Sequence, residues 1–300
     1  MIRPEDLLPD DTLIAVMGPR NSGKDRILDV VVRGVGGQVL PQSPPPAIRT
    51  YTITAIGRKS QRLVLACFPD FDGSNDVVVL QLISHWLKAT YERGLRLTGI
   101  LYTYRISDFI PKVSDLKDLF IFGQLCGDRA LARTTIVTTM WDKVDESEGE
   151  GCERMMSEIC WKEMLKWGCR TARFDDTFRS AMGILNKLID SGGEKEPLLV
   201  QEELVDLKML WNETQAGRML HASCHAALEE DKAELKKTQQ GIHTGIIRGR
   251  MQWSTQAMKE LEIPFNRYFA FRFPKKGKIV SLAGFATVLR VSDLVRREEL

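Results

Sequence analysis

The stretch that decides the fold is a glycine-rich loop, and it reads Gly18-Pro19-Arg20-Asn21-Ser22-Gly23-Lys24-Asp25. The apolar run 12–17 precedes the loop and the apolar run 26–32 follows it, so the sequence predicts a buried strand, a tight turn and the start of a helix. The spacing G-x-x-x-x-G-K is that of a phosphate-binding loop. Its backbone N–H groups and helix N-terminus face an anion, and its lysine reaches the outer phosphates. We therefore expect residues 18–25 to bind phosphate; an ordinary glycine-rich strand–helix turn is the alternative.

Asp25 departs from the usual pattern, which closes with Ser or Thr so that a hydroxyl can bind Mg²⁺. A carboxylate at this position indicates either a rewired metal site or a lost one. Asp25 and Asp72 are the candidate metal ligands. Two roles are open for Arg20, inside the loop: a cation beside the terminal phosphate, or a side chain that fills that space.

The composition is typical of a chain that folds in water. Its 300 residues suffice for one large domain plus an extension, and 43% are hydrophobic and 27% charged. A formal net charge of +2 gives no global field that favours nucleic acid or membrane. No apolar run reaches the ~18 residues of a membrane-spanning helix, and the first residues do not read as a secretory signal. We expect a cytoplasmic protein.

The cysteines have neither C-x-x-C spacing nor a histidine at metal-ligand spacing beside them. Such a pattern predicts free thiols in a reducing cytosol rather than a zinc site or a disulfide framework. The six are Cys67, Cys126, Cys152, Cys160, Cys169 and Cys224.

Predicted strands and helices alternate over about 180 residues, which indicates a mostly parallel sheet with helices on both faces. After the first strand, the expected strands are 48–56, 62–68, 97–104, 133–139 and 169–174, with a hairpin turn at 57–60. The expected helices after the loop helix are 76–87, 114–125, 150–167 and 177–188. In such sheets a ligand lies outside the carboxyl ends of the strands. The loops that follow four strands converge there: 18–25, 67–72, 139–142 and 174–177.

The composition changes near residue 197. Residues 198–240 are helix-rich and charged, and the irregular leucine spacing favours one or two partly docked helices over a long coiled coil. Residues 241–300 carry eleven Lys or Arg against five Asp or Glu, interleaved with aromatic residues. This segment is expected to be a peripheral hairpin or a disordered tail, and contact with nucleic acid or an acidic membrane is the alternative. The expected division is 10–193, 194–240 and 241–300.

Four stretches together resemble a G domain. They are the strand and loop at 14–24; residues 63–72, which stand where the family has V-D-T-P-G-F-D-D; Thr138-Thr139-Met140-Trp141-Asp142, similar to a T-T-M-W-D form of the guanine-reading motif; and residues 172–177, similar to an R-F-D-x-T loop. More narrowly, the chain resembles the septin-like, immunity-associated GTPase group, of the kind found in fungal G-domain proteins. The likeness covers about residues 10–240. It implies a three-layer P-loop NTPase G domain with a helical C-terminal extension.

The resemblance also implies that the chain binds GTP or GDP. Gly18, Gly23 and Lys24 would hold the phosphates, and Asp142 would accept hydrogen bonds from the guanine N1–H and exocyclic amine. A carboxylate suits this task because it offers two acceptors to two adjacent donors that adenine lacks. The implied guanine-binding set is Thr139, Asp142 and Phe174; a turn or helix-cap role is the alternative for Asp142. Relatives of this kind dimerise across the nucleotide face, so a homodimer is a further expectation.

The chain departs from the family at the elements that hold Mg²⁺ and the terminal phosphate. Where the family has a hydroxyl after the loop lysine, a switch threonine, an aspartate and a glycine, this chain has Asp25, the prolines 44–46 (or Thr50 or Thr52), Cys67 and Asp70. A carboxylate about 4 Å from a phosphate charge is repelled by roughly 4 kcal/mol at intermediate dielectric, and sulfur is a poor ligand for Mg²⁺. Binding of Mg²⁺ is therefore doubtful, and no catalytic residue is assigned.

Three functions remain open from the sequence. The first is a guanine-nucleotide-binding protein with little Mg²⁺ dependence and negligible hydrolysis. The second is a nucleotide-free pseudo-GTPase that acts as an interaction module, with Asp25 satisfying the helix N-terminus. The third is an active GTPase with rewired ligands, in which Asp25 and Asp72 hold the metal and Arg20 acts as an internal arginine finger.

Overall fold

The computed structural model of the chain describes residues 3–37, 46–56, 61–71, 73, 75–108, 113–191, 195–237 and 242–262. Three of the features expected from the sequence lie wholly or largely outside these ranges. They are the proline-rich segment 41–46, of which only the last residue is described, the hairpin turn at 57–60, and most of the basic, aromatic segment beyond residue 262.

A six-stranded sheet forms the centre of the described structure, with the strand order β2-β3-β1-β4-β5-β6. The strands are β1 (Thr12–Met17), β2 (Arg49–Ile56), β3 (Gln61–Cys67), β4 (Gly99–Arg105), β5 (Thr134–Thr139) and β6 (Arg170–Arg173). Only β2 runs antiparallel to its neighbour, and the other described pairs are parallel. Val16 lies opposite Cys67 in the register of β1 and β3, so the loop that leaves β1 starts beside the end of β3.

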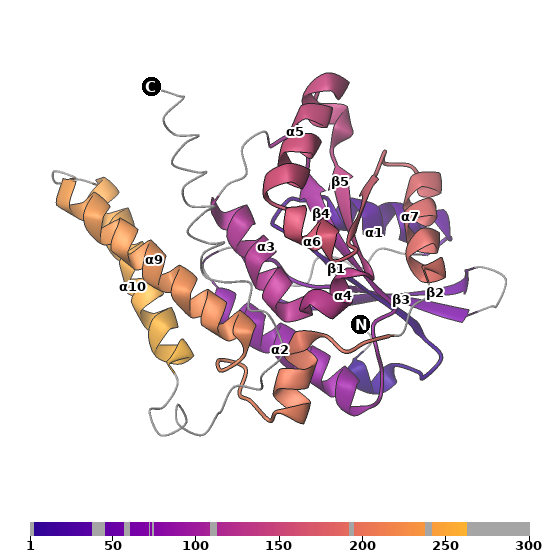
Figure 1. Cartoon of the computed structure of the whole chain (residues 1–300), viewed down its shortest axis with the longest axis horizontal. Coiled ribbons are helices and arrows are strands. Elements are labelled where there is room, and N and C mark those ends of the chain that lie inside the picture. Colours follow the sequence, from indigo (N-terminus) through magenta and orange to yellow (C-terminus); the bar gives the residue numbers. More distant parts are fainter. Residues whose placement is uncertain are drawn as a thin grey trace.

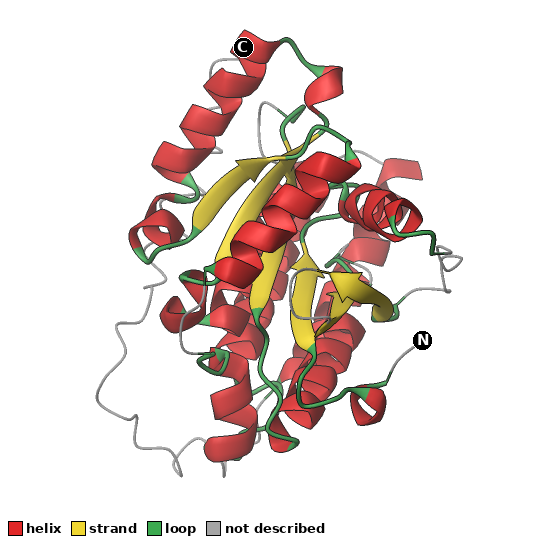
Figure 2. Ribbon diagram, turned by 90° about the vertical axis from the view of Figure 1, so that its right-hand side faces the viewer, coloured by secondary structure: helices red, strands yellow, loops and turns green. Residues whose placement is uncertain are grey.

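Helices cover both faces of this sheet (Figures 1 and 2). Their bounds in the first half are η1 (Pro4–Asp6), α1 (Lys24–Gly34), α2 (Asp76–Glu92), α3 (Val113–Cys126) and α4 (Asp128–Leu131). The second half has η2 (Trp141–Lys143), α5 (Glu146–Ile159), α6 (Lys162–Lys166), α7 (Phe178–Asp190), α8 (Leu199–Gln201), η3 (Glu202–Asp206), α9 (Gln215–Lys237) and α10 (Ile242–Leu261). The expected three-layer α/β architecture with a helical C-terminal region is confirmed.

The alternation of side chains along β1 explains why both faces are covered. Ile14 and Val16 pack in a cluster with residues of α1 and α7, whereas Leu13, Ala15 and Met17 pack in the cluster on the other face. All six residues of β1 are buried. A strand whose two faces are both apolar belongs in the interior of a sheet flanked by helices, so β1 fixes the glycine loop to the centre of the molecule.

The C-terminal helices pack on the face that carries α2 and α3. Leu198, Val200 and Leu220 are fully buried in the same hydrophobic cluster as α2 and α3. The Gln201 amide donates to the Leu87 carbonyl of α2 at 3.0 Å. Helices α9 and α10 lie side by side, on the side of the molecule away from α7 (Figure 1). The helical C-terminal region therefore shares a core with the sheet domain.

Two expectations about helices need correction. The helix expected over 150–167 begins earlier, at Glu146, and is broken into α5 and α6 around Trp161. The Trp161 side chain is fully buried and meets the Tyr104 ring edge-on, with 5.4 Å between ring centroids, so the chain turns to insert it. Residues 242–261, expected in a hairpin or tail, form α10, whose Arg250 pairs with Asp231 of α9 at 2.7 Å.

All six cysteines lie within the described residues and are free thiols, as expected. Burial raises the pKa of the thiols that the core encloses, Cys169 to about 12 and Cys224 to about 11. These side chains therefore act as small apolar groups. Among the helices that the structure describes, none combines the length and apolar character needed to cross a bilayer.

Candidate functional site

The glycine loop is tightly packed against the ends of β4 and β5. Gly18 and Gly23 have φ values of 142° and 90°, and Asn21 also lies at positive φ, 60°. A Cβ on Gly18 would approach the Thr103 hydroxyl to 2.4 Å, and one on Gly23 would approach the Thr139 hydroxyl to 2.8 Å. Both positions require glycine for conformation and for space. The two glycines therefore allow the loop to pack directly onto these strand ends.

Buried hydroxyls tie the loop to the two strands. Ser22 Oγ and Thr103 Oγ1 share a hydrogen bond of 2.5 Å, and the Thr103 hydroxyl also donates to the Met17 carbonyl at 3.2 Å. The Thr139 hydroxyl of β5 donates to the Ser22 carbonyl at 2.8 Å. The expected base-binding residue Thr139 thus positions the phosphate loop, because its hydroxyl is directed at the loop backbone.

Lys24, the first residue of α1, has its ammonium group within the loop although it is only 6% exposed. Its Nζ donates to the Gly18 carbonyl, and to the Pro19 carbonyl at 3.4 Å. It also lies 3.5 Å from Asp70 Oδ1. A buried ammonium must be paired or hydrogen-bonded to be tolerated. Lys24 is therefore held at the N-terminus of α1 by contacts with the glycine loop and Asp70.

The Asp25 carboxylate forms an ion pair with Arg49 of β2. Arg49 Nη2 also lies 3.5 Å from Cys67 Sγ, and Nη1 lies 3.5 Å from the Tyr51 hydroxyl. The Arg49 side chain is 15% exposed, against 53% for Asp25. Burial lowers the Arg49 pKa, whereas the hydrogen bond and the charge of Asp25 raise it, and the overall shift is upward. Arg49 is therefore a firmly charged guanidinium beside the start of α1.

These residues do not fit a Mg²⁺ ion. A P-loop protein holds the metal with a hydroxyl at the position of Asp25 and a carboxylate near the end of a neighbouring strand, where this chain has Cys67. The Asp25 carboxylate is engaged by Arg49, and burial raises the pKa of the Cys67 thiol, which keeps it neutral. Across the described residues, no three His, Cys, Asp or Glu side chains converge as metal ligands would. Asp72, the other candidate, lies outside the described residues.

Asp142 lies in η2, at the end of β5, and its side chain is 42% exposed. Arg26 of α1 approaches it to 3.5 Å and Lys143 to 3.3 Å. Arg26 also pairs with Asp176 at 2.5 Å. Partial loss of solvent raises the Asp142 pKa, but the two cations outweigh it and lower the pKa below its usual value. Asp142 is thus an ionised, accessible carboxylate. Its partner Arg26 follows Lys24 by two residues in α1.

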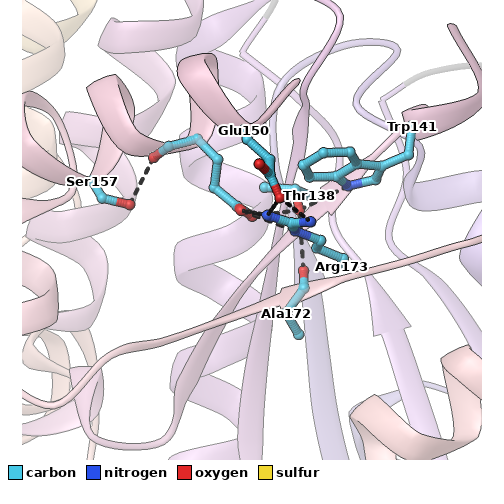
Figure 3. A network of polar contacts seen from close by, with 7 residues as sticks. Thr138, Trp141, Glu150, Ser157, Ala172 and Arg173 are labelled. Carbon is cyan, nitrogen blue, oxygen red and sulfur yellow. Dashed lines mark hydrogen bonds and ion pairs between the residues drawn. The ribbon is translucent and has the colours of Figure 1, made fainter. Parts of the chain in front are cut away.

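A polar network holds η2 in place (Figure 3). The Trp141 indole donates to Thr138 Oγ1 at 3.1 Å, and the Arg173 guanidinium lies 4.2 Å from the Trp141 ring centroid. Arg173 also pairs with Glu153 at 2.7 Å and with Glu150 at 3.4 Å. A cation over an indole face is attracted to it. The network therefore fixes the turn that carries the exposed carboxylate.

The fourth motif places its side chains differently from the expectation. The Phe174 ring is fully buried in the core cluster that contains Leu185, and its amide donates to the Thr138 carbonyl at 2.9 Å. Its role as a base-contacting side chain is therefore not supported, because the ring has no accessible surface. Two residues later, Asp176 adopts a φ of 63° and pairs with Arg26. Arg49, Arg26 and Asp176 are the site residues that sequence reasoning missed.

The sequence matches no protein-family model and no curated protein. Solved structures with a similar fold include a dimerization-deficient mutant of Toc33 from Arabidopsis thaliana, at 16% sequence identity and a TM-score of 0.47, over 63% of this chain and 87% of that chain. A Toc33 structure with Mg²⁺ and GMPPNP has 14% identity and a TM-score of 0.46, over 61% of this chain and 84% of that chain. The elongation factor SelB from Methanococcus maripaludis, with the GTP analogue GPPNHP, has 12% identity and a TM-score of 0.43, over 63% and 35%.

The chain's own topology defines its class. One antiparallel edge strand on an otherwise parallel sheet, with the glycine loop between β1 and α1, is the arrangement of a P-loop NTPase with the G-domain fold. A fold of this kind does not by itself fix an activity, so the function must be argued from the site.

Proposed function

We propose that this protein binds a guanine nucleotide, GTP or GDP, with its phosphates on the loop 18–25 and its base beside Asp142, and that it hydrolyses the nucleotide little or not at all. The observation that carries the proposal is that Lys24 and Arg26, at the start of the same helix, contact the two parts of the candidate site. Lys24 lies in the glycine loop, and Arg26, two residues on, contacts Asp142. This short distance along the chain between Lys24 and Arg26 supports a site that binds phosphate at Lys24 and the base at Asp142.

The phosphate end combines three favourable features. The N-terminus of α1 carries the positive end of the helix dipole. The loop conformation at Gly18 and Gly23 lets backbone N–H groups approach an anion closely. The ammonium of Lys24 can exchange its contacts with the Gly18 and Pro19 carbonyls for stronger charge-assisted bonds to phosphate oxygens.

The base end favours guanine over adenine. The ionised carboxylate of Asp142 offers two adjacent acceptors, which match the N1–H and exocyclic amine of guanine. Adenine presents no such pair of donors. Trp141 and Arg173 hold the turn that carries Asp142, and the Thr139 bond to Ser22 joins this end to the phosphate loop.

Weak hydrolysis follows from the surroundings of Asp25. Phosphoryl transfer depends on a metal ion and on donors that are positioned for the transition state. Asp25 is paired with Arg49, and the neutral Cys67 thiol lies beside them, so the residues at this point do not make an oxygen shell for Mg²⁺. The active GTPase with Asp25 on the metal is therefore disfavoured.

Mass analysis of nucleotide that copurifies with the full chain, followed by titration with a fluorescent guanine nucleotide, tests the proposal. We expect binding that Lys24→Ala weakens at least tenfold, a loss of ~1.4 kcal/mol. Lys187→Ala is the control, because this lysine lies in the last turn of α7. A wild-type protein that neither carries nor binds guanine nucleotide would contradict the proposal.

The contacts of Lys24 favour one alternative, a nucleotide-free interaction module. Its ammonium is already satisfied by the Gly18 and Pro19 carbonyls and by Asp70. Two further points are proposed along with guanine-nucleotide binding: that the chain belongs to the septin-like, immunity-associated subgroup, and that it forms a homodimer across the nucleotide face. Sedimentation of the full chain with and without GDP distinguishes the nucleotide-binding protein from the interaction module. A dimer that forms without nucleotide and does not change when GDP is added supports the module.

A further inference from the structure

The Arg49 guanidinium contacts Asp25 and Cys67, the two positions at which the chain lacks the usual metal ligands. It begins β2, and the antiparallel register places it opposite Cys67 at the end of β3. There it contacts Asp25, the second residue of α1. Its Nη2 also lies 3.5 Å from Cys67 Sγ. The position is therefore next to the helix N-terminus that faces phosphate.

We propose that Arg49 is a built-in cation that takes the place of the divalent metal, so that the protein binds the outer phosphates of its nucleotide without Mg²⁺. This inference rests on the proposed function. The ligand is a metal-free nucleoside diphosphate or triphosphate. Two side chains would bind its outer phosphates, Arg49 and Lys24.

Charge balance supports this assignment. Two ion pairs involve the first two residues of α1: Lys24 with Asp70, and Asp25 with Arg49. Without Arg49, the negative charge of the Asp25 carboxylate would repel a phosphate bound at the start of α1. Arg49 cancels that repulsion where it arises.

The chemistry of the guanidinium supports it as well. Arginine presents five N–H donors in a planar fork, always charged, and can engage a carboxylate and a phosphate at once. The Arg49 side chain is 15% exposed. Lysine lacks this fork. A cation that belongs to the chain cannot be removed by a chelator, which gives the inference a direct readout.

The test is fluorescence titration of the full chain with a fluorescent GDP, once in excess Mg²⁺ and once in excess EDTA. We expect equal wild-type affinity in both buffers and a loss of about tenfold or more for Arg49→Ala in both, the effect of ~1.4 kcal/mol. Arg49→Lys should fall between them. Arg33→Ala is the control, because this exposed arginine of α1 pairs only with Asp29 in the contacts described.

Arg49→Lys keeps the test decisive if Arg49→Ala folds poorly, and one double variant adds a second readout. Asp25→Ser/Arg49→Ala restores the hydroxyl and removes the guanidinium, and we expect its binding to be stronger in Mg²⁺ than in EDTA. Wild-type binding that collapses in EDTA, or Arg49→Ala and Arg49→Lys affinities equal to wild type in EDTA, would overturn the inference and leave the proposed function standing. Absence of wild-type binding in both buffers would overturn both.

Discussion

Arg26 Nη2 lies 3.5 Å from Asp142 Oδ2, so the carboxylate proposed to read the base already has an intramolecular partner. Both side chains are about two-fifths exposed, so water and salt screen this ion pair and it is weak. Guanine must compete with Arg26 for Asp142. We expect Arg26→Ala to strengthen guanine-nucleotide binding by no more than about fivefold, measured by fluorescence titration. A tenfold loss of nucleotide affinity would indicate instead that the ion pair of Arg26 with Asp176 holds the loop 174–177 in the conformation that binds nucleotide.

Asp142 itself should set the preference for guanine. Hydrogen bonds to charged groups are stronger than neutral ones and Asp142→Ala would remove two of them, so we expect it to lower GDP affinity by roughly a hundredfold or more. Affinity for ADP should change little, because adenine lacks the matching donors. Competition of GDP and ADP against a fluorescent nucleotide measures both. Asp29→Ala, on the exposed side of α1, should leave the preference unchanged; equal losses for GDP and ADP would argue against base reading.

Gly23 and Gly36 form a matched pair for testing how tightly the loop is packed. Both have positive φ, 90° and 74°, so alanine at either position carries similar backbone strain. A Cβ on Gly23 would meet the Thr139 hydroxyl at 2.8 Å, whereas one on Gly36 meets nothing within 4 Å. We expect Gly23→Ala to lower the free energy of unfolding by about 1–3 kcal/mol more than Gly36→Ala does. Urea unfolding of both variants gives this difference, and equal losses would show that the contact with Thr139 is not restrictive.

Glu203, at η3, should make stability depend on pH. Burial raises its pKa from 4.5 to about 8, although the Gln215 amide and Arg218 oppose the rise. The folded state therefore holds a proton that the unfolded state has released between about pH 4.5 and 8, and the free energy of unfolding falls as pH rises through this window. Glu203→Gln removes this titration. The free energy of unfolding of the variant, relative to that of the wild type, should therefore rise by on the order of 2–4 kcal/mol between the lower and the upper end of the window.

Urea unfolding of the wild type and Glu203→Gln at several pH values within the window measures that gain. Glu230→Gln, on the exposed side of α9, is the control and should follow the wild-type profile. A constant difference between wild type and Glu203→Gln at every pH would contradict the expected titration.

Local patterns made most of the fold predictable. The glycine spacing and the apolar run before it located β1, the loop and α1, and alternating strands and helices indicated a mostly parallel sheet. The break at Trp161 was not predictable, because it depends on the contact of that side chain with Tyr104 across the core. Helix α10 was missed because Gly245 and Gly249 weaken the helical pattern of 242–261, and because its position depends on α9.

The site was predictable where one segment contains its chemistry, and not where two segments meet. Lys24 and Asp142 belong to local motifs. Arg49 is separated from Asp25 by 24 residues, and only the antiparallel placement of β2 brings them together. The aromatic residue of the fourth motif, Phe174, was assigned to the ligand from the motif alone, whereas the core encloses it.

The shared core of the C-terminal helices decides where the chain can be shortened. A fragment ending at residue 193 would leave bare the surface of α2 and α3 that Leu198, Val200 and Leu220 now seal. Large apolar patches of this kind promote aggregation. We expect such a truncation to be recovered in the insoluble fraction and a fragment ending after α10 to stay in solution, so recombinant work on the nucleotide site should retain both terminal helices.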